Sequence, residues 1–189
     1  MSSYRNLDSV SKTLASRIWN GIKTDKRLKE IIRIEKQITC LSPKDAQAKS
    51  PQISVFLYNV TEFSIMRNLP QTIQNPPKPP TILHLNLHYL ITPLTQDAEN
   101  DQIVLGKIMQ LLSEKPVLRG SDLQGSLYEN GDDLRITLDS LATDDLNKLW
   151  TMFQTPYKLC LSYTVFPVRI ESSIKPVGKP VINKKINLQ

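Results

Sequence analysis

Apolar side chains recur at every second position in several stretches of the chain, which is the pattern of a strand with one face in a core. The clearest stretch runs from Thr81 to Ile91, and its apolar face comprises Leu83, Leu85, Leu87, Tyr89 and Ile91. Its other face is polar and carries His84, Asn86 and His88. A short stretch at 134–138 and a long one at 157–170 also alternate. The pattern therefore predicts three strands in the middle and last third of the chain.

Two further stretches predict strands of another kind. Residues 53–60 are apolar on both faces and rich in β-branched and aromatic side chains, which is typical of a central strand covered on two sides. An extension of this strand as far as Met66 stays open, and Arg67–Pro70 closes it. Residues 31–41 alternate too, although Lys36 interrupts their apolar row. We predict a strand there, with a continuing helix as the alternative.

Three other segments show the period of an amphipathic helix. The first spans 9–23, with Asp8 as its predicted N-cap. The second spans 101–114, where Gly106 costs about 1 kcal/mol relative to alanine and either admits a neighbouring backbone or is incidental. The third, Thr143–Phe153, starts with its predicted N-cap, and two aspartates in its first turn complement the helix dipole.

Polar and proline-rich segments separate these elements. Residues 42–51 and 119–133 are predicted to be turns and loops. Residues 75–80 hold four prolines, which favour extended backbone. We interpret this run as a stiff loop, with a docking motif for a proline-reading domain as the alternative. Residues 172–189 have no period that places them in a core, so they are either disordered or ordered on a partner.

The predicted order is helix, strand, strand, strand, helix, strand, helix, strand. This order lacks strict alternation of strands and helices, so we predict the α+β class, with a mixed, mainly antiparallel sheet and helices packed on it. The 189 residues suit one compact domain with an appendage. We place the domain at 1–171 and a basic C-terminal extension at 172–189. A domain of this size requires no disulfide or metal.

Charge is spread unevenly along the chain. Residues 1–40 carry nine Lys/Arg and four Asp/Glu, a net +5, whereas residues 101–171 carry seven and ten, a net −3. Residues 172–189 add four lysines and no acid to the overall +6. Such polarity suits nucleic acid, but it also suits docking between protein subunits of opposite field.

Residue types that carry covalent or metal chemistry are sparse. His84 and His88 share one face of a predicted strand but stand roughly 13–14 Å apart at the usual rise, so one ion cannot bridge them. The sequence contains no phosphate-binding glycine loop, dinucleotide-binding glycine motif or nucleophile elbow. Asp132, Asp133 and Asp139 are interpreted as solvated, loop-capping groups rather than as an acid–base pair. We therefore predict no enzyme activity, no metal and no cofactor.

Cysteine usage and the start of the chain bear on the compartment. Cys40 and Cys160 lie in apolar, strand-like runs and are predicted to be buried, reduced thiols. Residues 1–6 lack the apolar stretch of a secretory signal, and no run of about 18 apolar residues predicts a membrane span. The expected compartment is the cytoplasm.

One basic segment keeps nucleic acid open as an alternative. It contains Lys23, Lys26, Arg27, Lys29, Arg33 and Lys36. A single-strand binder interleaves such residues with exposed aromatics, and only Trp19 lies close. The segment is therefore read as a solvated face or a protein-docking surface, and a basic nucleic-acid-binding α+β module remains the alternative function.

Several short motifs follow one another in a recognisable order over about residues 8–171. They are Val55–Val60, Leu69–Pro70, Leu85–Ile91, Leu105–Gln110 followed by Pro116–Leu118, and Leu149–Trp150 with Leu161–Tyr163. Together they resemble the small cap proteins, or tail terminators, of extracellular contractile injection systems of the antifeeding-prophage type.

The resemblance implies a structural role without catalysis. It implies a hexameric ring that ends the inner tube and holds the last sheath layer, in a particle that is either released or anchored. The expected partners are further copies, the inner tube protein and the sheath protein. The family includes longer proteins with a further C-terminal domain, so a longer paralogous cap is a further expected partner.

Charge and expected exposure select the residues for these contacts. The predicted subunit interface, which would face the acidic region of the next copy, comprises Lys26, Arg27, Lys29 and Arg33. The predicted contacts to tube or sheath comprise Arg67, Lys175, Lys179, Lys184 and Lys185.

Overall fold

The fold was analysed in a computed structural model that describes residues 3–49, 52–63, 82–131 and 133–172. Its helices are α1 (Asn6–Ile22), α2 (Lys26–Ile31), α3 (Pro43–Gln47), α4 (Ala98–Glu114), α5 (Ser126–Asn130) and α6 (Thr143–Phe153), with 3-10 turns at Ser3–Arg5, Glu35–Gln37 and Gly120–Asp122. Its strands are β1 (Ile38–Thr39), β2 (Ile53–Glu62), β3 (Ile82–Pro93), β4 (Val117–Leu118), β5 (Leu134–Asp139) and β6 (Leu161–Glu171).

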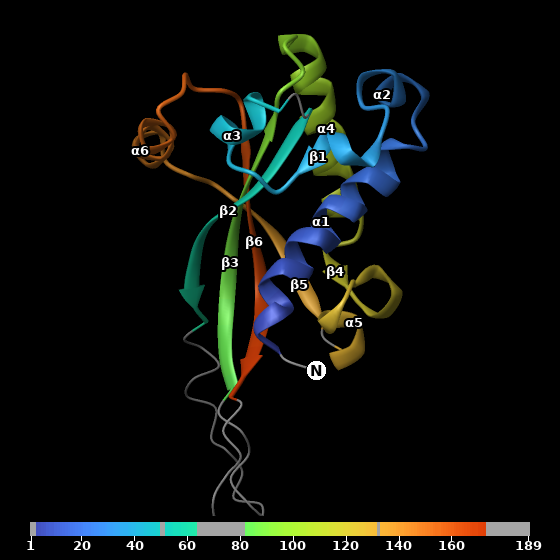
Figure 1. Ribbon diagram of the computed structural model, residues 1–189, viewed down its shortest axis with the longest axis vertical. Coiled ribbons are helices and arrows are strands. Elements are labelled where there is room, and N and C mark those ends of the chain that lie inside the picture. The colour runs from blue at the N-terminus through green and yellow to red at the C-terminus, as the bar shows by residue number, and fades with distance from the viewer. Residues whose placement is uncertain (1–2, 50–51, 64–81, 132, 173–189) are drawn as a thin grey trace, which may run out of the picture.

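The strands form one six-stranded sheet in the order β1-β2-β3-β6-β5-β4. The β1–β2 pair is parallel and the other four pairs are antiparallel. The long strands β3 and β6 stand in the middle, and helices pack on the sheet (Figure 1). This arrangement confirms the predicted α+β class with a mixed, mainly antiparallel sheet.

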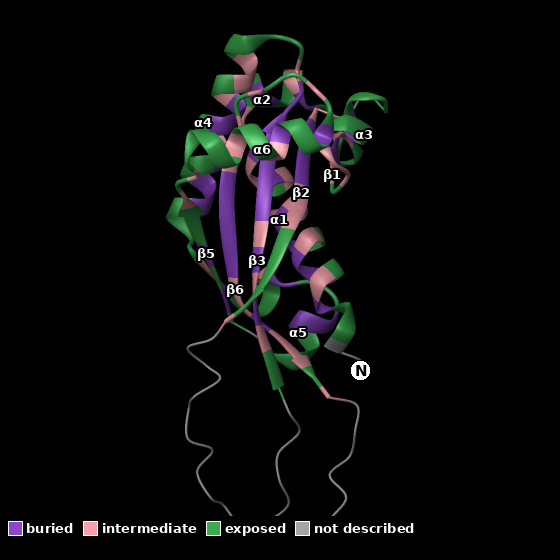
Figure 2. Cartoon of the chain, turned by 90° about the vertical axis from the view of Figure 1, so that its left-hand side faces the viewer, coloured by how far each residue is buried: buried purple, intermediate pink, exposed green. Residues whose placement is uncertain are grey.

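One face of the sheet is covered by α1, α4 and α5 and holds the main core (Figure 1). Leu87, Tyr89 and Ile91 of β3 are fully buried in this core, as the predicted alternation requires, whereas Leu83 near the start of the strand is exposed. Figure 2 shows buried residues along much of β3 and β6. From α1, Leu14 and Ile18 enter the same core at the helical spacing read from the sequence. We call this the helix-bearing face.

The opposite face is covered by α6 at one end. There Leu90, Trp150 and Phe153 form a second apolar cluster, with Phe56 partly buried against it. Phe153 meets the rings of Phe56 and Trp150 edge-on, at centroid distances of 5.7 and 5.8 Å. Such edge-to-face pairs add to the free energy gained by burial. Helix α6 is therefore held on the sheet mainly by aromatic side chains.

Both predicted helix caps are wrong. Helix α1 begins at Asn6, so Asp8 lies in its first turn, where it pairs with Lys12 at 2.7 Å. Helix α6 has the predicted bounds, but Ala142 occupies its N-cap and Thr143 is already helical. A carboxylate in the first turn still complements the helix dipole at both helices.

The strand predicted at 31–41 is also wrong over most of its length. Asp25 caps α2 by accepting hydrogen bonds from the backbone N–H groups of Arg27 and Leu28, and this helix runs to Ile31. Beyond it only Ile38–Thr39 is strand, so the continuing helix does not hold there either. The apparent alternation arose because α2 and β1 each bury one or two apolar side chains in the core.

Several boundaries differ from the sequence prediction. The segment 119–133, expected to be a loop, contains α5, which ends at Gly131 in the left-handed region with φ of 65°. Strand β4 was missed, and β6 begins at Leu161 rather than at 157. Strand β2 is buried only over its first residues, so it is not covered on both faces throughout. The proposed extension to Met66, its end at 67–70 and the proline run at 75–80 lie outside the described residues.

Candidate assembly surfaces

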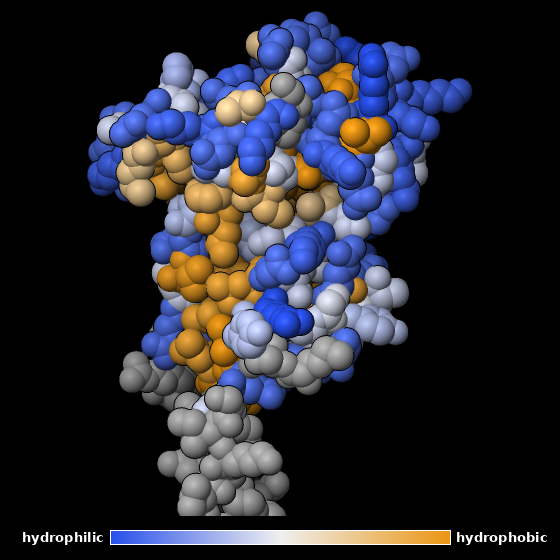
Figure 3. Space-filling model, viewed as in Figure 1, coloured by the Kyte–Doolittle hydropathy of each residue, from blue (hydrophilic) through white to orange (hydrophobic). Residues whose placement is uncertain are grey.

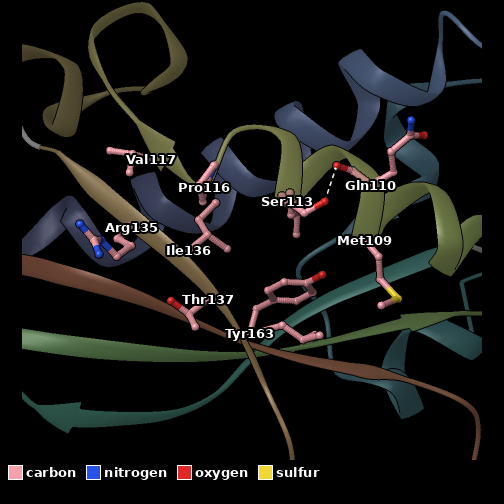
Figure 4. A pocket seen from close by; sticks show the side chains of 11 residues that line it. Met109, Gln110, Ser113, Pro116, Val117, Arg135, Ile136, Thr137 and Tyr163 are labelled. Carbon is pink, nitrogen blue, oxygen red and sulfur yellow. Dashed lines mark hydrogen bonds between the residues drawn. The ribbon is translucent and has the colours of Figure 1, made fainter.

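A groove runs between α4 and the outer edge of β5, on the helix-bearing face. Its volume is about 720 Å³, and it is lined by Met109, Leu112, Pro116, Ile136, Leu138 and Tyr163, among others. Figure 4 shows the Tyr163 ring and the Ile136 and Met109 side chains pointing into the groove from three different elements. Leu138 is 46% exposed and Met109 is 40% exposed. An exposed apolar groove of this kind is typical of an interaction site rather than of a free surface.

A second apolar region lies at the other side of the same face, over β2 and β3. Val60 is 40% exposed and Leu83 is 42% exposed. Figure 3 shows apolar side chains gathered along the sheet beside α1. The two apolar regions therefore flank the helices on opposite sides of the sheet.

On the opposite face, a row of polar side chains crosses four strands. Thr61 lies on β2, His88 on β3, Thr164 on β6 and Asp139 on β5. The Thr61 hydroxyl lies 3.0 Å from His88 Nε2, and the Thr164 hydroxyl lies 2.9 Å from His88 Nδ1. Thr164 donates its own proton to Asp139 Oδ2, so it accepts the Nδ1–H of His88. These hydrogen bonds link β2, β3, β6 and β5 through their side chains.

A hollow of about 590 Å³ adjoins this polar row, between the sheet and α6. Tyr58, His88 and Asp139 line it from the sheet, and Lys148 and Leu149 line it from α6. Burial raises the pKa of the Tyr58 phenol, whose hydroxyl lies 3.1 Å from that of Ser162. Its side chains can donate and accept hydrogen bonds, so the hollow offers polar contacts to a partner.

The histidines and cysteines do not assemble a metal site in the part of the chain that the structure describes. No three His, Cys, Asp or Glu side chains come together there. Burial, and secondarily the charge of Arg169, lowers the pKa of His84. Cys40 and Cys160 are free thiols, but Cys40 is exposed and Cys160 is only partly buried, so the prediction that both are buried is wrong. Cys40 follows the two-residue strand β1 at the margin of the sheet.

The predicted interface residues lie on the surface. Lys26, Arg27 and Lys29 are exposed on α2, and Arg33 is exposed just beyond it. Arg27 forms an ion pair with Glu99 of α4 at 3.0 Å, between side chains that are both largely exposed. The structure brings the three α2 residues together on one short helix. Arg67, Lys175, Lys179, Lys184 and Lys185 lie outside the described residues.

The sheet edges and the groove were not predicted as functional features. The sequence did offer a sign of the groove. Met109 and Leu138 are large apolar residues, and other apolar residues on the same elements are buried. Their exposure depends on where β4 ends, and a two-residue strand leaves no periodicity in the sequence. Among the described helices none is both long and apolar enough to cross a membrane.

Comparison with known proteins decides the family. Residues 9–184 match the family described as the Pvc16 N-terminal domain. The chain belongs to this family. No curated protein matches the chain. As a Pvc16 N-terminal domain, it bears out the predicted membership of the cap and tail-terminator proteins of extracellular contractile injection systems.

A solved structure shows the same fold. The chain is similar to the PVC sheath/tube terminator of an extracellular contractile injection system in the extended state, with a TM-score of 0.62 and 14% identity, over 96% of this chain and 62% of that one. It is also similar to the tube-terminating cap of the anti-feeding prophage, with a TM-score of 0.48 and 19% identity, over 71% of this chain and 48% of that one. The chain thus spans less than two thirds of the length of either protein.

Proposed function

We propose that this protein is a structural cap of a contractile injection system. Six copies form a ring that ends the inner tube and holds the last layer of sheath. The protein acts by shape and contact, without catalysing a reaction. Its place is in the cytoplasm, on an assembling particle.

The observation that carries this proposal is the family match together with the shared fold. The match spans residues 9–184, and the similarity to a protein described as a sheath/tube terminator extends over 96% of the chain. The whole α+β body, rather than one motif, is therefore common to both. A shared fold over the whole body supports a role in which the body itself forms the contacts.

The surface features of the fold support the same role. A cap must contact its own copies, the tube and the sheath, and so needs several separate interaction surfaces. The groove beside β5, the apolar region over β2 and β3 and the hollow beside α6 lie on different parts of the sheet. A ring uses two different surfaces of each copy, and the remaining ones are left for other partners.

Further contacts are proposed from charge. The basic residues of α2 contribute to the interface between copies, and exchanging Lys26, Arg27 and Lys29 for glutamate would weaken the ring at low salt. The lysines at 175, 179, 184 and 185, with Arg67, contact tube or sheath. A longer paralogous cap protein is a further proposed partner.

Deletion of the gene tests the cap role. Particles purified from a deletion strain should have tubes and sheaths of irregular length, or contracted sheaths, when measured by negative-stain electron microscopy. Expression of the full chain from a plasmid should restore one uniform length. Uniform, extended particles without the protein would contradict the proposal.

A matched variant separates loss of capping from loss of folding. Residues 173–189 lie beyond the last described strand, so a chain that ends at Ser172 retains every element of the described domain. We expect this variant to fold, as judged by thermal denaturation, and to restore uniform length poorly. Full restoration would show that the basic extension makes no required contact.

A further inference from the structure

We propose that copies of this chain join through the two margins of the sheet, with the open edge of β2 in one copy pairing with the open edge of β5 in the next. The inference rests on the proposed function, because it specifies how the subunits of the ring meet. The partner is a second copy of this chain.

The first open edge belongs to β2. Strand β1 pairs with only Ile53 and Ser54 of this ten-residue strand. From Val55 to Thr61, β2 has β3 on one side, and the described residues place no strand on the other. Unpaired backbone groups along a strand edge favour pairing with a strand from another chain.

The second open edge belongs to β5. Strand β4 pairs with only Leu134 and Arg135. The N–H of Ile136 still donates to the carbonyl of Pro116 at 2.8 Å, which shows that Ile136 points its backbone groups outward. Because the direction alternates along a strand, Leu138 also points its N–H and C=O outward, and no strand among the described residues lies there. This edge borders the groove under α4.

Both edges carry apolar side chains on the helix-bearing face and at the same level. Leu57 of β2 pairs with Tyr89, Tyr89 pairs with Tyr163, and Tyr163 pairs with Leu138 of β5. These four residues form one row across the sheet. If subunits repeat sideways, Leu57 and Val60 of one copy meet Leu138 and Met109 of the next, and both apolar regions are covered at once.

Strand direction agrees with this arrangement. Three successive antiparallel pairings, β2–β3, β3–β6 and β6–β5, make β2 and β5 run in opposite directions. Subunits that repeat sideways in the same orientation therefore place β2 beside β5 as an antiparallel pair. Each copy then contacts one neighbour through β2 and the other neighbour through β5. This is the head-to-tail contact that closes a ring.

Charge selects this head-to-tail contact over a twofold contact between like edges. Residues 33–49, around β1, carry four Lys/Arg and two Asp/Glu. The described residues of 129–145, around β5, include five carboxylates and only one basic residue, Arg135. Two β5 edges would repel each other, and so would two β1–β2 margins. The acidic margin beside the basic margin is the attractive combination.

Site-specific crosslinking tests the pairing directly. In a Cys40→Ser, Cys160→Ala background, we would introduce Val60→Cys, Leu138→Cys, or both, and treat particles purified from cells that express each variant with a short bismaleimide. The doubly substituted chain should give a ladder of covalent oligomers that ends at the closed ring. Either single variant alone should give no dimer, and co-expressed single variants should stop at the dimer.

A matched control uses a cysteine on the other side of the sheet. Met152 on α6 is 75% exposed, and Met152→Cys combined with Val60→Cys should give no ladder. Covalent dimers from Leu138→Cys alone would overturn the proposal, because they require β5 to face β5.

The outcome also separates this inference from the cap role. If the particles contain the chain at their ends but the double variant gives no ladder, the pairing of β2 with β5 is wrong and the cap role stands. If purified particles lack the chain altogether, the proposed function itself fails.

Discussion

Asp139 reaches His88 through the hydroxyl of Thr164: Oδ2 and Nδ1 lie 3.6 Å apart, and Thr164 bonds to both. These three side chains come from β5, β3 and β6, so the contact links strands that are remote in sequence. Thr164 is buried, whereas Thr61 at the other end of the row is exposed. The network therefore stabilises the sheet at the level where α6 leaves its face uncovered.

Removal of the central hydroxyl should destabilise the domain. In Thr164→Val, both His88 and Asp139 lose a hydrogen-bond partner, and we expect the free energy of unfolding to fall by about 1–3 kcal/mol. Urea denaturation followed by circular dichroism measures this change. Thr61→Val is the matched control and should cost less, because water can replace the exposed hydroxyl. An equal loss in the two variants would contradict this account of the row.

Helix α6 should depend on its aromatic anchor. Phe153 contacts the rings of Phe56 and Trp150, and Phe153→Ala should lower the free energy of unfolding by about 3 kcal/mol. The neighbouring Met152 is exposed, so Met152→Ala should change the free energy of unfolding by less than about 0.5 kcal/mol. Thermal denaturation of both variants distinguishes an anchored helix from a loosely held one.

Two helical glycines should respond to alanine in opposite directions. Apart from its chain neighbours and its own helix backbone, no atom of the described residues lies within 4 Å of a Cβ placed on Gly106. Gly106→Ala should therefore stabilise the protein by up to about 1 kcal/mol. A Cβ on Gly21 would lie 2.2 Å from Leu111 Cδ1, so Gly21→Ala should displace that buried side chain and destabilise the core. Chemical denaturation of the two variants measures whether the free energy of unfolding rises or falls in each.

The loop before α5 should lose stability in acid. Lys115 Nζ donates to the Asp122 carboxylate at 2.6 Å, and this bond, with the N–H of Arg119, lowers the pKa of Asp122. A carboxyl whose pKa is lowered by folding adds stability above its unfolded value of about 3.9 and loses it as the pH falls. Asp122→Asn should therefore be less stable than the parent at pH 7 and equal to it near pH 2, as measured by urea midpoints.

The sequence predicted the long elements well because their burial is periodic. Strand β3 has one face in the core from Leu85 onward, so Leu87, Tyr89 and Ile91 recur at every second position. Helix α6 was predicted with its observed bounds because its apolar residues recur at helical spacing. In each of these two elements, the apolar residues recur with a single period because a single face is buried.

The short elements could not be predicted for the same reason. Strands β1 and β4 have two residues each, which is too few to show a period. Ile32, just after α2, and Ile38 of β1 are both buried from extended backbone, and their even spacing imitated one continuous strand. In the described part of the chain, β1 and β4 each pair with only two residues of β2 and β5, so the candidate assembly edges could not be predicted from the sequence either.

The candidate residues chosen from charge alone were only partly informative. The basic residues on α2 are exposed as expected, but Arg27 already pairs with Glu99 within the same chain. Leu138 and Met109 are apolar in the sequence, but only the assembled sheet shows that they are exposed. Contacts between subunits depend on which side chains the fold leaves uncovered, and this depends on tertiary packing.

Cryo-electron microscopy of the particle end tests the central claim most directly. A reconstruction of purified particles, with the chain carrying a small C-terminal tag, should show a sixfold ring of this α+β fold on the last tube layer and in contact with the last sheath layer. Particles that are complete and extended but carry the chain elsewhere, or not at all, would contradict the account.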